Sequence, residues 1–561
     1  MRPDRVKELA LALTAFPSVT GSEGETRFAP FLRGLLASWP YYRAHPDQLR
    51  LLKTLDDPIE RSILVALVRP EGPAREGKAL ILTGHYDVVS ASCYGSLEPW
   101  AFEPEALAPR LVAELEAEEA RARARGERLS DSEARALADL RSGEFLPGRG
   151  LLDMKAGLAA GLALLEERAA SALRGPAGNQ GGGALVFLAV PDEEGASHGM
   201  LSAVRLLPVL LEEWGLEPLA AINLDAAVDQ GSGEEGRALF LGSVGKLHPF
   251  ALFVGRPSHA GAPFDGINPA LLAAEYARRI ECSPGLCPAS EAGAELPPPP
   301  TILYHRELRE RYDVTMPPAV FVSANLLSHA RGPAEALELI GREAAAAMDS
   351  ALGLLRERAE DFSRASGRPW APPDRRPRLL GWAELEAAAR AAAPAAYAAA
   401  LEKARAAPET MAGLAALVGE AAALAGLEGP AAVVGLAPPY YPRAALDPAA
   451  DAGLIALLAR LSADFEAEGR GSLALRPFFP GISDMSFLYP GDEEEARNLA
   501  SSACPLGLDP LPAAFSCPAV NIGPWGREYH QRLERVHADY AFRTLPELLR
   551  RAAAALLGAE P

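Results

Sequence analysis

The chain has 561 residues and a formal net charge of −19 at pH 7, from 74 acidic residues against 55 lysines and arginines. This balance argues against a nucleic-acid partner, which needs a basic surface, and no apolar run reaches the roughly 18 residues of a membrane span. The length exceeds what one hydrophobic core normally holds, so we expect several domains.

The first 16 residues read as an amphipathic helix with charges throughout, and they lack the uninterrupted apolar stretch of a signal peptide. The cysteines are odd in number and scattered, which does not suit a disulfide framework. They are Cys93, Cys282, Cys287, Cys504 and Cys517. These features predict a cytoplasmic protein.

Short apolar segments at 63–68 and 79–83 are typical of buried strands, and the second runs into Gly-His85-Tyr-Asp87. Because residues i and i+2 of an extended segment point the same way, His85 and Asp87 should face one side. A carboxylate beside a metal-binding imidazole orients the ring and raises its basicity. The alternative is that His85 is an ordinary polar residue at a strand end.

Residues 103–141 are rich in Glu, Arg, Ala and Leu, and they predict a helical, solvated excursion to which we assign no chemistry. The glycine-rich loop 148–157 follows, with Asp153 as its only carboxylate, and a helical pattern begins at Leu158. Glycines let the backbone approach a ligand closely. A carboxylate in such a loop can bind one cation or bridge two, so Asp153 is our candidate for the centre of a metal site.

Two further apolar strands are predicted at 184–190 and 219–224. The first runs into Pro-Asp-Glu193-Glu194-Gly, and the second ends at Asp225. Adjacent acids after a strand are compatible with a solvated loop, but the buried type of the strand and the following glycine favour a site.

The middle of the chain contains strands and helices without such polar strand ends, which predicts a separate α+β domain inserted into the catalytic one. An alanine-rich helical stretch, 383–429, completes it, and residues 433–442 are predicted to return to the catalytic sheet. The predicted division is therefore 1–243 and 429–561 for the catalytic domain, and 244–428 for the inserted domain.

A last strand near 518–523 leads towards His530, with Glu534 four residues further on. In open α/β sheets the ligand site lies at the carboxyl ends of the strands, and alternating strands and helices predict such a sheet. Two imidazoles and three carboxylates suit zinc, cobalt or manganese better than calcium or magnesium. They exceed the needs of one tetrahedral zinc with an open position, so we expect two ions that share Asp153.

These motifs, in this order, resemble those of the co-catalytic metallohydrolase family that includes aminoacylase, carboxypeptidase G, succinyl-diaminopimelate desuccinylase and acetylornithine deacetylase. The long excursion before Asp153, the Pro-Pro-Tyr-Tyr-Pro segment and Gly-Ile-Ser-Asp484-Met-Ser-Phe are similar to the arginine-utilisation RocB branch. The resemblance implies an α/β, zinc-exopeptidase-like catalytic domain, with a mixed sheet flanked by helices. It also implies an inserted α+β, ferredoxin-like lid that carries extra helices and is the usual dimerisation surface.

The resemblance further implies amide hydrolysis of a small N-acyl amino acid or peptide by a metal-activated water. Asp153 would bridge two zinc ions, with cobalt or manganese possible. Glu193 would be the general base, Asp87 the partner of His85, and His259 would help to stabilise the oxyanion. The implied metal ligands are His85, Asp153, Glu194, Asp225 and His530.

Several alternatives stay open on the sequence. A dipeptidase or carboxypeptidase competes with a deacylase, and other classes are a metal-dependent binding protein without turnover and a structural protein assembled through the alanine-rich stretch. Asp484 is interpreted as a turn cap sooner than as a pocket residue. His198 is assigned to the loop surface, and Arg256 to a surface ion pair sooner than to a substrate carboxylate.

Overall fold

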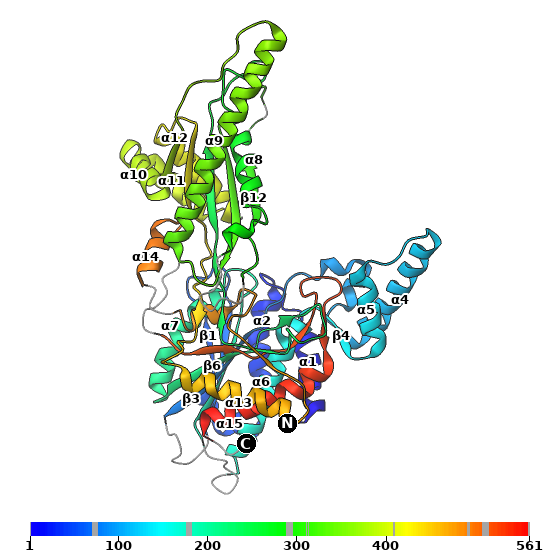
Figure 1. Ribbon diagram of the computed structural model, residues 1–561. Coiled ribbons are helices and arrows are strands. Elements are labelled where there is room, and N and C mark those ends of the chain that lie inside the picture. Colours follow the sequence, from blue (N-terminus) through cyan, green and yellow to red (C-terminus); the bar gives the residue numbers. More distant parts are fainter. Residues whose placement is uncertain are drawn as a thin grey trace. The chain divides into compact units, whose positions relative to one another are not determined.

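The computed structural model describes residues 2–69, 77–174, 182–287, 296–309, 311, 313–407, 410–490, 494–507 and 515–558. These residues form two compact units, coloured by sequence in Figure 1. The first unit comprises Met1–Ser243, Ala444–Gly491 and Leu511–Pro561, and the second comprises Val244–Arg443 and Asp492–Pro510.

An eight-stranded mixed sheet forms the core of the first unit, in the order β1-β2-β5-β3-β6-β18-β8-β17. The strands are β1 (Leu49–Lys53), β2 (Ser62–Val68), β5 (Ala184–Val190), β3 (Lys78–His85), β6 (Glu217–Asn223), β18 (Ala519–Asn521), β8 (Ala238–Phe240) and β17 (Ala474–Arg476). Strands β5, β3, β6 and β18 are parallel to their neighbours within this group. Their carboxyl ends therefore meet at one edge of the sheet.

Helices pack around this sheet, as expected for central strands such as β2 and β5, which are buried along nearly their whole length. Helices α6 and α15 contact β3, α2 contacts β1 and β2, and α7 contacts β2, β5 and β6. The helices are α1 (Pro3–Thr14), α2 (Glu23–Ala37), α3 (Pro40–Ala44), α6 (Ala156–Ala172), α7 (His198–Glu213), α13 (Ala452–Ala467) and α15 (Leu545–Leu557). The 3-10 helices are η1 (Pro46–Gln48), η2 (Ser92–Trp100) and η5 (Asp484–Phe487), and the π-helical segments are η3 (Leu151–Lys155) and η6 (Tyr540–Thr544). The predicted mixed α/β architecture with helices flanking a sheet is confirmed.

The start of α6 lies unusually close to the end of β6. A Cβ atom on Gly157 would stand 2.1 Å from the carbonyl oxygen of Leu224. Glycine is required there because any side chain would collide with backbone. The approach brings the loop before α6 next to the residue that follows Leu224, which is Asp225.

The excursion between β3 and the glycine-rich loop is helical, as predicted, and Figure 1 shows it as the pair α4 (Pro104–Ala124) and α5 (Asp131–Ser142) beside β4. A capping box at Ser130 and Glu133 begins α5, and Gly143 ends it in the left-handed conformation. A small sheet adjoins the pair, in the order β4-β20-β19-β7. Its strands are β4 (Phe145–Pro147), β20 (Arg535–His537), β19 (Trp525–Arg527) and β7 (Ala227–Val228).

The second unit is built on the strand order β10-β13-β11-β15-β14, with β12 also paired to β13. One apolar cluster joins the sheet to α8 and α9, and another joins it to α10, α11 and α12. The strands are β10 (Gly245–Leu247), β11 (Pro249–Val254), β12 (Thr301–Glu307), β13 (Ala319–Ser328), β14 (Arg378–Gly381) and β15 (Ala431–Leu436). The helices are α8 (Pro269–Ile280), η4 (Pro284–Leu286), α9 (Pro333–Ser366), α10 (Trp382–Ala392), α11 (Pro394–Arg405), α12 (Thr410–Leu424) and α14 (Glu494–Ser502).

The prediction that residues 433–442 return to the catalytic sheet is wrong. Strand β15 pairs with β11 along six residues and with β14 along four, all in the second unit. The chain rejoins the first unit at Ala444, where β16 (Ala444–Ala445) pairs with β9 (Gly242–Ser243). An apolar segment between turn residues indicates burial, but it does not say which of two sheets buries it.

In the described part of the chain, no helix is both long and apolar enough to cross a lipid bilayer.

Candidate metal centre

The predicted metal ligands gather where the parallel strands of the first unit end. His85 is the last residue of β3, Glu194 follows β5, and Asp225 follows β6. Asp153 lies in η3 just before α6, and His530 lies in the loop between β19 and β20. Two sets have ligand atoms within 4.8 Å of one another, namely His85 with Asp153 and Asp225, and Asp153 with Glu194 and His530.

Asp153 stands between the two imidazoles. Its Oδ1 lies 3.1 Å from Nε2 of His85, and its Oδ2 lies 3.0 Å from Nε2 of His530. Nε2 of His530 is 2.8 Å from Oε1 of Glu194, and Nε2 of His85 is 4.0 Å from Oδ1 of Asp225. Each oxygen of one carboxylate therefore faces a different ligand set, which is the arrangement of a bridging ligand.

The charges at this edge are unbalanced without a cation. Burial works to raise the pKa of Asp153, but hydrogen bonds with His530 and His85 outweigh it and hold that pKa well below its ordinary value. Burial, with Asp153 next to it, raises the pKa of Asp225 to about 7. Burial also raises the pKa of Glu193 well above its ordinary value, and Asp225 adds to the effect. Crowded buried carboxylates are unfavourable unless compensated, so the donor set fits a pair of divalent ions.

Glu193 lies beside the first ligand set and belongs to neither set. Its Oε2 is 3.9 Å from Nε2 of His85, and its side chain is largely buried. The position suits a carboxylate that exchanges a proton with a reactant bound at the ions.

Asp87 has two separate contacts where the sequence predicted one. Nδ1 of His85 lies 3.0 Å from the carbonyl oxygen of Asp87, but 3.7 Å from its carboxylate, which is too far for a hydrogen bond. The carboxylate instead accepts the backbone N–H groups of Glu193 (3.1 Å) and Glu194 (3.2 Å), and the hydroxyl of Thr20 (3.0 Å). The backbone of Asp87 thus orients the ring, and its side chain holds the turn that carries both glutamates.

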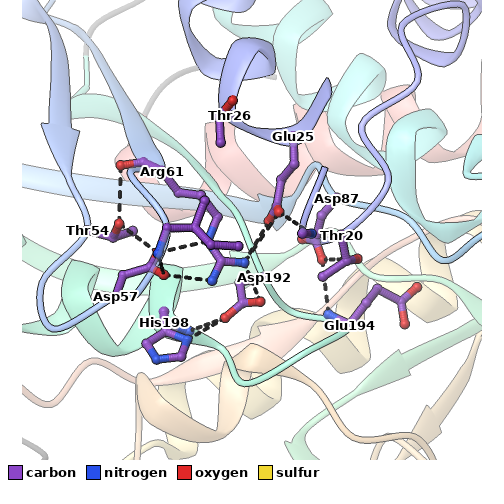
Figure 2. Close-up of polar contacts among 12 residues, drawn as sticks. Thr20, Glu25, Thr26, Thr54, Asp57, Arg61, Asp87, Asp192, Glu194 and His198 are labelled. Atoms are coloured by element: carbon purple, nitrogen blue, oxygen red, sulfur yellow. Dashed lines mark hydrogen bonds and ion pairs between the residues drawn. The ribbon is translucent and has the colours of Figure 1, made fainter. Parts of the chain in front are cut away.

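A buried ion network lies under the same turn (Figure 2). The guanidinium of Arg61, only 3% exposed, forms two 2.8 Å hydrogen bonds with Asp57 and donates to Glu25 at 3.1 Å and to Asp192. Figure 2 shows Arg61 reaching between these carboxylates. One guanidinium can satisfy several carboxylates because its five N–H donors are fixed in a plane.

Asp192 connects the Arg61 network to the turn that carries Glu193 and Glu194. Its Oδ2 accepts the backbone N–H of His198 at 3.1 Å and lies 2.6 Å from Nδ1 of the same residue, a contact drawn in Figure 2. Asp192 has a left-handed φ of 69°, which a non-glycine residue adopts only when its surroundings hold it. His198 is therefore a bound partner of the turn and not a loop-surface residue, and the hydrogen bond with Asp192 raises its pKa.

A second buried pair connects the loops of Asp153 and His530. Glu534 pairs with the guanidinium of Arg149, and its Oε1 accepts the backbone N–H of Gly150 at 2.9 Å. Both side chains of the pair are buried. The contacts tie the glycine-rich loop to the segment that follows His530.

Asp484 does not cap the turn, contrary to the interpretation favoured from the sequence. The turn cap at this position is Ser483, whose side chain accepts the N–H of Met485. Asp484 itself is buried, and burial raises its pKa to about 8, with His85, Asp87 and Asp225 among the charges that act on it. It therefore belongs to the electrostatic surroundings of the first ligand set.

The remaining predicted residues lie in the second unit. His259 is exposed on the loop between β11 and α8, where its Nδ1 accepts the N–H of Gly261 at 3.0 Å. Arg256 is also exposed and exchanges backbone hydrogen bonds with Ile267. Their roles towards a substrate remain predictions.

The chain is similar to known proteins in sequence and in fold. The profile of peptidase family M20/M25/M40 matches residues 136–489. Protein YqjN of Bacillus subtilis strain 168 is 31% identical over 572 residues, covering 99% of this chain and 96% of YqjN. Protein RocB of the same organism is 27% identical over 572 residues, covering 99% and 95% of the two chains. The solved structure of an M20 family metallo-carboxypeptidase, Sso-CP2 from Sulfolobus solfataricus, is similar with a TM-score of 0.51 at 11% identity, over 98% of this chain and 99% of that one.

Proposed function

The chain belongs to peptidase family M20/M25/M40 and is a metallohydrolase that acts on amide or peptide bonds, and from this premise we propose that its substrate is a small N-acyl amino acid or a short peptide. The 27% identity to RocB favours a substrate met in arginine utilisation, such as an N-acylated arginine. A dipeptidase or carboxypeptidase activity at the same site is the competing proposal.

Two divalent ions complete the proposed site, most simply zinc, with cobalt or manganese as alternatives. His85, Asp153 and Asp225 would hold one ion, and Asp153, Glu194 and His530 the other. The observation that carries this proposal is the pair of 3.1 and 3.0 Å separations between the Asp153 oxygens and the two imidazoles. When bound, such ions polarise a carbonyl group and lower the pKa of a water molecule.

The protein's own groups carry the proton in this mechanism. Glu193 accepts the proton of the attacking water and delivers it to the leaving amine, as a general base and then a general acid. Asp87 keeps Glu193 in place through the backbone N–H that it accepts at 3.1 Å. His259 donates to the developing oxyanion.

We also propose a cytoplasmic location, supported by five free cysteines, and a homodimer formed through the second unit, which size-exclusion chromatography tests.

Replacing Glu193 tests the proposed chemistry. Glu193→Gln keeps the size of the side chain and removes its base, so it should retain both ions while kcat falls by at least about 10²-fold. Turnover is measured on a panel of N-acyl-arginines, other N-acyl amino acids and dipeptides, and metal content by elemental analysis. Glu235→Gln, at an exposed glutamate that belongs to neither ligand set, is the matched control. Wild-type kcat in Glu193→Gln at full metal content would contradict the assigned role.

A further inference from the structure

The loop that carries His530 has a backbone that needs outside support. Glu528 and His530 both have left-handed φ values, 57° and 65°. Each such residue costs on the order of 1–3 kcal/mol unless its surroundings hold it. His530 is also the most exposed of the proposed ligands, with 41% of its side chain accessible. The position of its imidazole therefore depends on what contacts the rest of the loop.

Helix α4 provides the main polar contact. Arg532 donates to Glu114 at 2.6 Å and to both carboxylate oxygens of Glu118 at 3.0 and 3.1 Å. Glu114 and Glu118 are four residues apart, so they lie on the same face of α4. Two carboxylates on one helix thus hold a guanidinium two residues after His530.

Helix α5 contacts the same loop from both of its ends. Asp139 accepts hydrogen bonds from Arg535 at 2.8 and 2.7 Å and pairs with Arg527 at 3.1 Å. The hydroxyl of Ser132 donates to Glu528, one of the two left-handed residues. Arg527 and Arg535 begin and end the segment that contains His530.

Apolar packing completes the contact. Leu533 is buried in the cluster formed between α4, α5 and η2, where Leu107, Leu111, Leu115 and Leu137 lie. A leucine of this kind contributes about 1.5–3 kcal/mol when fully buried. The helices therefore share a core with the loop as well as ion pairs.

We propose that the α4–α5 pair is a positioning element for the metal centre: through Arg532, Asp139 and Leu533 it holds His530 against Asp153 and Glu194, and so sets the affinity for the second ion. The inference rests on the proposed function in needing a metal ion at His530. It gives a role to residues 103–141, the excursion to which the sequence alone assigned none.

A positioning role differs from a merely stabilising one in what it changes. Loss of Arg532 should weaken the ion held by Glu194 and His530 and leave the ion held by His85 and Asp225 unchanged. Loss of a similar arginine-carboxylate contact elsewhere in the molecule should weaken the binding of neither ion. Arg551 of α15 provides that control, because it bridges Glu468 at 2.7 and 2.8 Å and Glu547 at 2.8 Å.

The test compares full-length Arg532→Met with Arg551→Met. Metal-free protein is titrated with Co²⁺ alone, and the two binding steps are followed by absorbance and calorimetry. Arg532→Met should weaken the second step by about 10–100-fold, the range for loss of a group that orients a ligand, and excess Co²⁺ should restore its kcat. The affinity of Arg532→Lys in the second step should lie between those of the wild type and Arg532→Met, because one ammonium cannot match two carboxylates as a guanidinium does.

The double variant with Glu114→Gln and Glu118→Gln removes the charges on α4 that hold Arg532. It replaces Arg532→Met in the titration if that variant does not fold. Unchanged affinity for the second ion in these variants, or equal weakening of both ions, would overturn the inference. Failure of the proposed function gives a different result: wild-type protein that binds no ion pair, or that binds two ions and hydrolyses nothing in the substrate panel.

Discussion

The candidate metal centre has two arginine-carboxylate supports of the same chemistry in different surroundings. Under the turn of Glu193 and Glu194, Arg61 is 3% exposed among three buried carboxylates. Beside His530, Arg532 is 24% exposed and its acidic partners on α4 are similarly accessible. Water screens an exposed ion pair and leaves it little net stability, whereas an unpartnered charge in the interior is costly. The buried arginine should therefore govern folding, and the exposed one should govern local geometry.

The largest expected difference is in stability. Arg61→Met leaves Glu25, Asp57 and Asp192 without their cation, so the free energy of unfolding should fall by about 3–5 kcal/mol. Arg532→Met should lower it by no more than about 1 kcal/mol. Urea unfolding of both variants in the presence of a chelator measures the two values under one condition. Similar losses in the two variants would remove the distinction drawn between buried and exposed supports.

The next difference concerns the ions themselves. His85 is 2% exposed and His530 is 41% exposed, so a chelator should remove the ion at His530 first. His530→Ala should leave a single ion bound and lower the affinity for the other by more than the roughly 10–100-fold typical of an outer contact. Metal release is followed with a chromogenic chelator. Loss of both ions together in His530→Ala would show that the two ligand sets do not act separately.

The third difference is a pH dependence of stability at the buried support. Burial, reinforced by Asp87, raises the pKa of Glu25 to about 7 against the opposing charge of Arg61. The unfolded chain has an ordinary glutamate pKa of about 4.3, so between these values the folded state binds more protons. The contribution of Glu25 to stability is then full below about pH 4.3 and is lost as the pH rises towards 7.

Glu25→Gln removes this titrating group while keeping a hydrogen-bonding side chain. The free energy of unfolding of the variant should therefore decline less steeply than that of the wild type between about pH 4.3 and pH 7. Unfolding at several pH values in this window measures the two slopes. Parallel slopes would mean that Glu25 does not change its protonation on folding.

Much of the fold could be predicted because its signals are local. The apolar segments before His85, Glu193 and Asp225 are the strands β3, β5 and β6, and the acidic, alanine-rich excursion is helical. The meeting of the polar residues at one edge of the sheet could be predicted because the carboxyl ends of parallel strands lie together. Sheet membership of residues 433–442 could not be read, since both sheets accept an equally apolar strand.

The supports of the site were missed for a different reason. Arg61 contacts Glu25 and Asp192, which lie 36 and 131 positions away in the chain. Nothing in the spacing of these residues marks them as partners, whereas the polar strand ends are marked by the strands before them. Arg532 and Glu118 are 414 positions apart, and only the folded chain brings them together.

The position of His530 in the sequence also sets an order of assembly on the ribosome. The proposed ligand set of His85, Asp153 and Asp225 is complete in the polypeptide once residue 225 has been made, but His530 follows 305 residues later (530 − 225), after the whole of β10–β15. A nascent chain therefore contains the first three of these residues long before it contains His530. On the proposed mechanism, a product that stops short of residue 530 would lack the imidazole of the second ligand set and could not complete the ion pair.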